Sequence, residues 1–357
     1  MFYKYRFLKK FLVILTTIIF SSGVFGQTGG NNTYEFLNLP VSARVAALGS
    51  NFLVANDNDL SLAVINPSLI GDNLHHQLSL SFAEYISDVN YGTVAYSHTF
   101  KKVGSFATAL QFINYGRFLE ADETGLTYGN FSGGEYAFTL GWGRKLHKNF
   151  MLGANLKMIY SQLEKYNSFG LAVDVAGTYV HEKSGFMASV LFKNIGRQLD
   201  AYVPGNIEPL PFEFQLGIAQ RFKKLPLRYS VVYNHLEKWD LTYADPRISN
   251  VDPVSGDTIN KGKLEVFADK LMRHFVLGIE FYPAKRFYIS IGYNYQRRHE
   301  LRTEVKKGLV GFSFGCGINI YKFRISYAWA KYHLKGAPNT FTISTNLVDL
   351  FSKKEKK

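Results

Sequence analysis

The chain has 357 residues, and its 41 lysines and arginines outnumber its 28 aspartates and glutamates, which gives a formal net charge of +13. Its single cysteine, Cys316, excludes an intramolecular disulfide. After the first 26 residues, no stretch has the ~18 uncharged apolar residues that a spanning helix needs, so any later membrane crossing has to be made by strands.

Residues 1–26 have a basic start, a short apolar stretch and a run of small residues that ends at Gly26. This order predicts a secretory signal peptide that is removed, so that the mature chain begins near Gln27. The alternative is an N-terminal membrane helix, but the apolar run is shorter than the ~20 residues that a span requires.

Residues 27–76 follow, and they lack any regular alternation of polar and apolar side chains. Polar residues such as Arg44, Asp57 and Asp59 are mixed with apolar ones such as Leu48. The segment ends in the pair His75-His76, for which a capping or solvent-exposed role is favoured over metal binding, because adjacent histidines seldom face one ion.

From residue 77 to residue 348 the sequence alternates with a period of two. The stretch 308–320, GLVGFSFGCGINI, places apolar residues on one face and small or polar residues on the other. About fourteen such segments follow one another, and tight connections, as at Lys101-Lys102, alternate with longer ones, notably 116–133, 195–211 and 238–271. This pattern predicts an all-β membrane protein, an antiparallel outer-membrane β-barrel of about fourteen strands.

A soluble β-sandwich would also alternate apolar and polar faces. Its connections need not alternate in length, however, and strands of about ten residues with aromatic apolar faces fit a tilted membrane span better. The barrel assignment predicts that the long loops lie at the cell surface and both termini on the periplasmic side. It also predicts that Cys316 faces lipid and Asn319 faces the lumen.

A fourteen-stranded barrel encloses a lumen that wall side chains alone do not fill. We therefore predict that residues 27–76 fold inside it as a plug, or hatch. The residues expected to carry this role are Arg44, Ala46, Leu48, Gly49, Asp57, Asp59, Asn66 and Pro67.

No pattern for catalysis stands out: a His-Glu-x-x-His pair, a phosphate-binding glycine loop and a Gly-x-Ser-x-Gly turn are all missing from the sequence. We expect no enzyme activity, no cofactor and no metal. Lys157 and Asp174 should lie opposite one another in the lumen as an ion pair that braces the wall, and Glu280 and Arg324 should also face inward. The basic charge, including the tail at 349–357, suits outer-membrane lipid head groups rather than nucleic acid.

The N-terminal segment resembles a known family. Its tokens are Tyr34-Glu35-Phe36-Leu37, Ser42-Ala43-Arg44, Ala46-Ala47-Leu48-Gly49 and Asn66-Pro67, and they look like the mature N-terminus of PorQ-type barrels of the type IX secretion system. These barrels belong with PorV-type barrels to a wider group similar to the FadL fatty-acid transporters. Ser68 departs from that group, which has alanine after Asn-Pro. The resemblance implies fourteen strands, an N-terminal hatch and an attachment complex with a PorZ-like surface protein, a PorU-like sortase and a PorV-like barrel.

Two functional alternatives remain beside surface attachment: a FadL-like transporter of hydrophobic small molecules and a PorV-like cargo shuttle. Transport would need an apolar patch in the lumen and a gap beside a kinked strand, and the lumen faces read as mostly small or polar. A partner-binding loop is predicted at 238–271, where aromatic and turn residues combine: Trp239, Tyr243, Pro246, Pro253 and Phe267. The alternative for this loop is a solvated cover over the barrel mouth.

Overall fold

The computed structural model describes residues 32–55, 57–242, 262–301, 308–331 and 336–351. From Asn32 onward the chain forms one compact unit. The predicted signal peptide, the cleavage site near Gln27 and the last residues of the basic tail lie outside the described residues.

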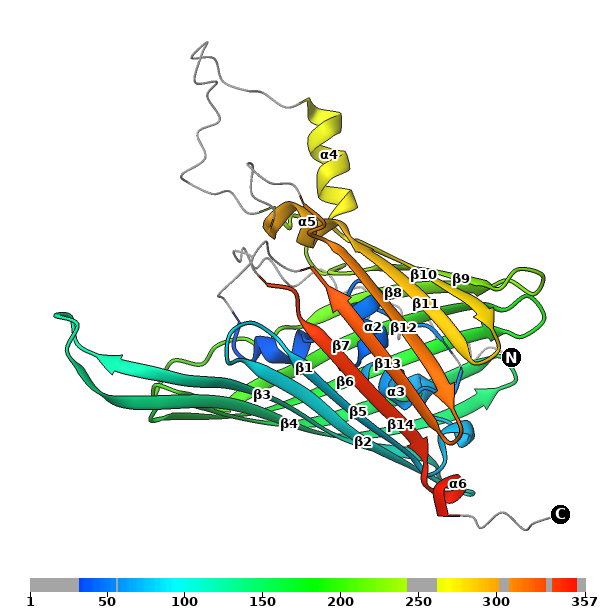
Figure 1. Cartoon of the computed structure of the whole chain (residues 1–357), viewed down its shortest axis with the longest axis horizontal. Helices are drawn as coiled ribbons and strands as arrows, with labels where there is room; N and C mark the ends of the chain where they lie inside the picture. Colours follow the sequence, from blue (N-terminus) through cyan, green and yellow to red (C-terminus); the bar gives the residue numbers. More distant parts are fainter. Residues whose placement is uncertain (1–31, 56, 243–261, 302–307, 332–335, 352–357) are drawn as a thin grey trace, which may run out of the picture. The chain divides into compact units, whose positions relative to one another are not determined.

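Fourteen antiparallel strands form a closed barrel in which each strand pairs with its neighbours in sequence and β1 pairs with β14 (Figure 1). The predicted fold class is thereby confirmed. The strands are β1 Gln77–Glu84, β2 Asn90–Phe100, β3 Gly104–Ala121, β4 Thr127–His147, β5 Phe150–Leu163, β6 Tyr166–His181, β7 Phe186–Asp200, β8 Glu213–Arg221, β9 Leu227–Tyr233, β10 Phe275–Ala284, β11 Phe287–Asn294, β12 Phe312–Ile320, β13 Phe323–Ala330 and β14 Asn339–Asn346.

Two of the expected loops are partly strand. Most of 116–133 continues the β3–β4 ladder, because a register shift after Asn114, with Gly116 at φ +81°, lets pairing resume at Arg117 and Phe118. The rings of Phe118 and Phe131 then stack at 5.2 Å. The predicted loop 195–211 likewise begins only after β7 ends at Asp200.

The barrel has two different ends. The turn end carries the short connections at 101–103, 148–149, 182–185, 222–226, 285–286 and 321–322, and the loop end carries the others. The barrel closes at Asn346, two residues before the predicted limit of 348. The Asn346 side chain accepts a hydrogen bond from the Val348 amide at 3.0 Å and so starts α6, Leu347–Phe351.

The N-terminal segment before β1 lies inside the ring of strands. Its short helices are η1 Glu35–Asn38, α2 Ala43–Ala47, α3 Leu60–Ile65, η2 Pro67–Leu69 and η3 Asp72–Leu74. Helix α2 contacts β11 to β14, α3 contacts β1 to β3, and η2 contacts β4 to β6, so these helices touch ten of the fourteen strands. We call residues 32–76 the plug.

Two further helices belong to the loop end: α4, Lys263–Met272, and α5, Tyr295–Leu301. Among the described residues, no helix combines the length and apolar character that a membrane crossing requires.

The wall separates apolar from small or polar side chains. Ile289 and Ile343 point outward and are 40% and 45% exposed, whereas Ser290 and Ser313 point inward and are fully buried. Cys316 pairs with Ile289, and directly paired residues share a face of the sheet, so Cys316 lies on the outward face. An apolar exterior around a closed barrel is the form that a lipid bilayer requires.

Candidate functional site

The plug owes its local structure to polar caps. Asp59 accepts a hydrogen bond from the Ser61 amide at 3.2 Å and starts α3, and Asn66 accepts one from the Ser68 amide at 3.2 Å ahead of Pro67, the first residue of η2. Ser42 caps α2 through the Val45 amide at 3.4 Å. These caps set the plug's turns at fixed places along the lumen, and the Asn66 side chain also bonds to the wall.

A buried ion cluster joins the plug to the wall near the turn end. The Arg44 guanidinium contacts Asp57 at 2.7 Å, Asp59 at 3.0 Å and, across the lumen on β10, Glu280 at 2.8 Å. Arg228 on β9 contacts Asp57 at 2.8 Å and Glu280 at 2.9 Å. Because every charge has at least one opposite partner, the cluster can remain ionised out of bulk water.

A second polar contact fixes the plug at Asn66. Its amide donates to the carbonyl of Leu53 at 2.8 Å and to the hydroxyls of Thr178 on β6 and Ser189 on β7 at 3.3 and 3.2 Å. Ser68 contacts Thr178 at 2.6 Å. The Asn-Pro-Ser sequence is therefore a plug-to-wall joint.

The wall is glycine-rich where the plug backbone lies against it. A Cβ added at Gly153 on β5 would overlap the backbone of Pro67, and one at Gly292 on β11 would overlap Leu48 and Gly49. Gly49 itself has φ +85°, and its amide donates to the Ser313 hydroxyl at 3.0 Å. The inward glycines thus allow backbone-to-backbone approach along the lumen.

The apolar plug residues form a core inside the barrel. Leu48, Leu53, Leu60 and Leu62 are each at most 1% exposed and belong to one buried cluster that includes inward alanines of the wall. Ala46 packs with Ala328 of β13 in a smaller cluster. Where this cluster lies, the plug fills the lumen rather than lining it.

Lys157 and Asp174 form an ion pair at 2.7 Å, but not in the expected register. The β5–β6 turn pairs Leu163 with Tyr166, so Lys157 lies opposite Ala172 and Asp174 lies opposite Asn155. The turn residues are Glu164, at φ +57°, and Lys165, and this register places Asp174 two positions away from the residue opposite Lys157. The pair forms diagonally.

The loop-end half of the lumen is more apolar than the sequence indicated. Tyr34, Phe36 and Leu37 of the plug pack against inward residues of the wall that include Tyr91 and Ile159. The reading of the lumen as mostly small or polar is therefore wrong here. The signal for this apolar region was an aromatic residue on the inward face of a strand, such as Tyr91 at the second position of β2.

The predicted partner-binding loop is described only in part. Trp239 lies 5.3 Å from Phe267 of α4 and 5.8 Å from His274, measured between ring centroids. Tyr243, Pro246 and Pro253 lie outside the described residues.

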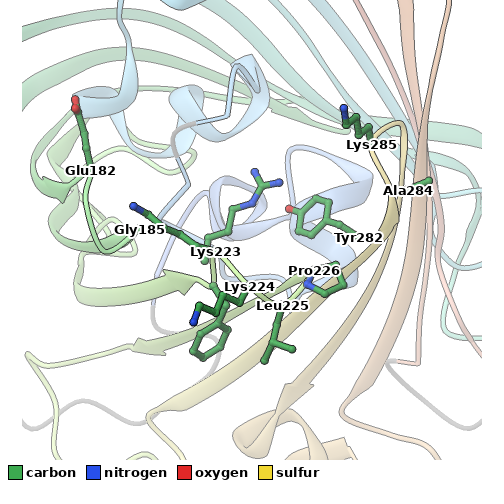
Figure 2. A pocket seen from close by; sticks show the side chains of 11 residues that line it. Glu182, Gly185, Lys223, Lys224, Leu225, Pro226, Tyr282, Ala284 and Lys285 are labelled. Carbon is green, nitrogen blue, oxygen red and sulfur yellow. The ribbon is translucent and has the colours of Figure 1, made fainter.

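A pocket of about 590 Å³ opens at the turn end, between the β6–β7, β8–β9 and β10–β11 turns. Figure 2 shows Tyr282 projecting into it from β10, with Lys223, Lys224 and Lys285 on the surrounding turns. Tyr282 also donates to Glu280 at 3.1 Å, and the Arg221 guanidinium lies 4.7 Å from its ring centre. The basic side chains give the pocket a positively charged rim. The pocket borders the ion cluster through Tyr282.

A smaller pocket of about 130 Å³ lies at the loop end beside His235, Glu213 and Lys193. Burial alone would lower the pKa of His235, but the carboxylates of Glu213 at 3.7 Å and Glu237 at 3.0 Å outweigh it and raise the pKa to about 9.

The sequence identified four members of the ion cluster as plug or inward-facing residues and missed the fifth. It singled out Arg44, Asp57 and Asp59 and placed Glu280 inward, but it did not include Arg228. The alternation of LRYSVVY in β9, which sets Arg228 on the inward face with Ser230 and Val232, carried that signal. Arg324 donates to the carbonyl of Asn58 at 3.1 Å.

The closed ring of strands, its apolar exterior and the packed plug define an outer-membrane β-barrel with an internal hatch. No protein-family model and no curated protein matches the chain.

Among solved structures, the chain is similar to a deltaS2 mutant of the TodX monoaromatic hydrocarbon channel, with 12% identity over 86% of this chain and 97% of that one and a TM-score of 0.49. It is also similar to the CymD monoaromatic hydrocarbon channel, with 10% identity, coverage of 86% and 96% and a TM-score of 0.45. A Pseudomonas aeruginosa FadL homologue has 11% identity, coverage of 86% and 98% and a TM-score of 0.45. Likeness at this level transfers no activity.

Proposed function

We propose that this chain is a non-catalytic outer-membrane barrel that holds a partner protein at the cell surface through its loop end. In this proposal the loop end faces outward, the turn end and both termini face the periplasm, and the plug keeps the lumen closed.

The observation that carries the proposal is the exposed aromatic and apolar surface around α4. No residue of α4 is buried, Leu264 is 80% exposed, and Phe267 is 51% exposed beside Trp239. Large apolar side chains gathered in water at the mouth of a barrel suit the centre of a protein interface.

This surface is held in place, which a solvated cover does not require. Lys270 of α4 pairs with Asp240 at 2.6 Å, and Asp269 pairs with Arg273 at 2.9 Å and accepts a hydrogen bond from Tyr295 of α5 at 3.1 Å. The helix is fixed at its C-terminal end while Leu264 and Phe267 remain exposed. A positioned apolar surface loses less conformational entropy on binding than a loose loop.

The N-terminal motif supports the choice of partner. Its likeness to PorQ-type barrels points to a PorZ-like surface protein, together with a PorU-like sortase and a PorV-like barrel. The solved structures described above are named as channels, so the anchoring role rests on the α4 surface and on this motif.

The test is to replace residues 240–265 by a short Gly-Ser loop in the native cell. We expect the barrel to remain assembled and the PorZ-like partner to appear in the medium. A double variant, Leu264→Ser with Phe267→Ser, should release the partner without shortening the loop. The matched control is Leu126→Ser, since Leu126 is 63% exposed at the tip of the β3–β4 hairpin. Retention of the partner by both loop variants contradicts the proposal.

A second function, passage of small hydrophobic molecules, is favoured by a kink in the wall. The register between β6 and β7 shifts between Val173 and Val175, and Asn194 has φ +57°. The backbone amide of Asn194 donates to the Asp174 side chain at 2.8 Å. Ala172, one residue before this shift, belongs to the same apolar cluster as Phe36, so the irregular strand lies beside an apolar patch, the combination that transport needs.

Uptake of a labelled long-chain fatty acid and of a monoaromatic hydrocarbon separates the two functions. If deletion of the protein abolishes uptake while the surface partner stays on the cell, the transport function replaces the anchoring one. If uptake is unchanged and the partner is released, anchoring stands.

A further inference from the structure

Three histidines meet at the turn end, where the plug passes into the barrel wall. Their ligand nitrogens all lie within 4.8 Å of one another, and each ring is half-buried. The ring centroids of His75 and His76 are 3.9 Å apart, and each lies 4.8 Å from the ring of His98. The neutral imidazole nitrogen is a common ligand for zinc and related ions.

The backbone explains why neighbouring histidines share one side. In a regular strand, successive side chains point to opposite faces, but His76 adopts the left-handed conformation at φ +58°, which turns it toward His75. The register that pairs Leu78 with Tyr96, continued by two residues, brings His76 opposite His98. The expectation that adjacent histidines seldom face one ion therefore does not apply here.

We propose that His75, His76 and His98 bind one divalent transition-metal ion of the zinc class, which clamps the end of the plug to the barrel wall. Zinc takes imidazole nitrogens at about 2.0–2.1 Å, which sets tetrahedral ligands about 3.3 Å apart. The three nitrogens lie within 4.8 Å of one another, so they have to move up to about 1.5 Å closer to bind one ion. The half-buried position leaves room for water as the fourth ligand.

The hydrogen bonds around the rings determine which nitrogens are free. His76 Nδ1 lies 2.7 Å from the Tyr96 hydroxyl, and when this nitrogen donates its proton to Tyr96, Nε2 has a free lone pair for the metal. His75 Nδ1 accepts from the Thr99 amide at 3.0 Å, so binding through either nitrogen of His75 exchanges that hydrogen bond for the metal bond. The ring of His98 packs against the other two histidines and Phe100.

An acidic side chain lies beside the three histidines. The carboxylate of Asp72 interacts electrostatically with His75 and accepts a hydrogen bond from the Ser105 hydroxyl at 3.3 Å. Neutral imidazoles are the form that binds metal, and the negative charge of Asp72 would partly compensate a divalent ion bound to them.

The clamp would join three parts of the molecule. His75 directly follows η3 of the plug, His76 precedes β1, and His98 lies near the end of β2. The carbonyls of His75 and His76 also accept hydrogen bonds from Asn346 and Leu347, at 2.8 Å each, so the last strand meets the same point. A bound ion would therefore hold the plug where the barrel closes.

The experiment is zinc titration by calorimetry of the barrel, purified without a histidine tag, treated with chelator and then freed of it. We expect one zinc ion per chain in the wild type. His98→Gln and His75→Gln should each weaken zinc affinity by more than about tenfold, and Tyr96→Phe by about tenfold through loss of the hydrogen bond to His76. Zinc should also raise the unfolding temperature of the wild type.

The matched control is His147→Gln, because His147 is an exposed histidine at another turn of the same end. It should bind zinc as the wild type does. Cobalt absorption gives a second readout, since a tetrahedral histidine site produces a visible band that His98→Gln should lose. Absence of saturable binding in the wild type, or equal affinity in wild type and His98→Gln, overturns the proposal.

Discussion

The plug-filled lumen and the α4 surface use similar residue types in opposite ways. In the lumen, leucines of the plug are fully buried and the charges of Arg44, Asp57 and Glu280 are paired within 3.0 Å. At the loop end, Leu264 and Phe267 are exposed, and α4 buries no side chain. The lumen has the packing of a protein core, whereas α4 leaves its apolar side chains exposed, as the proposed partner interface requires.

This difference predicts which substitutions change the stability of the barrel and which change its binding. Substitutions in the lumen should lower stability or unseat the plug, while substitutions on α4 should leave the barrel intact and change what it binds. The predictions that follow test the lumen first and the loop end last, from the largest expected effect to the smallest.

Arg44→Met should have the largest effect, because it leaves Asp59 and part of the charge on Asp57 and Glu280 buried without their partner. We expect a loss of about 3–5 kcal/mol in the free energy of unfolding. Urea unfolding, followed by the mobility difference between folded and heated barrels on gels, measures it. In planar bilayers the variant should also show higher ion conductance.

The control is Lys145→Met, which removes an exposed pair with Glu182 at 3.6 Å. Exposed pairs contribute at most about 1 kcal/mol, so the barrel should be nearly as stable as the wild type. Equal stability losses in the two variants would show that the buried cluster does not hold the plug.

Gly153→Ala should have an intermediate effect, because the added Cβ overlaps the backbone of Pro67 and the joint at Asn66 has to shift. Overpacking of this kind costs about 1–3 kcal/mol. The measurement is protease cleavage within the plug, which should become faster. Gly177→Ala is the control, since its Cβ meets the flexible side chain of Leu152 at 3.1 Å. Similar cleavage rates in both variants would contradict the close seating of the plug.

The strand pattern was predictable because one face of each strand meets lipid and the other meets the plug, so a period of two survives over the whole barrel. The length of β3 and β4 was not predictable, because the parts near their shared hairpin are exposed on both faces and lose the alternation. The ion cluster was half predictable: Arg44 and Asp57 lie in one irregular segment, but their partner Arg228 is 171 residues from Asp57. The three-histidine site depends on one left-handed residue, His76, which no periodicity indicates.

The smallest predicted effect is a pH dependence at the loop end. The pKa of His235 is raised from 6.5 to about 9, so its ion pairs with Glu213 and Glu237 stabilise the folded barrel fully below pH 6.5, and this contribution is lost as the pH rises through about 9. Because the side chain is partly solvated, we expect less than about 1 kcal/mol. The difference in unfolding temperature between wild type and His235→Gln, measured from pH 6 to pH 10, should shrink toward zero above pH 9. A difference that stays constant over this range would mean that His235 acts through packing, because only the charged imidazole depends on pH.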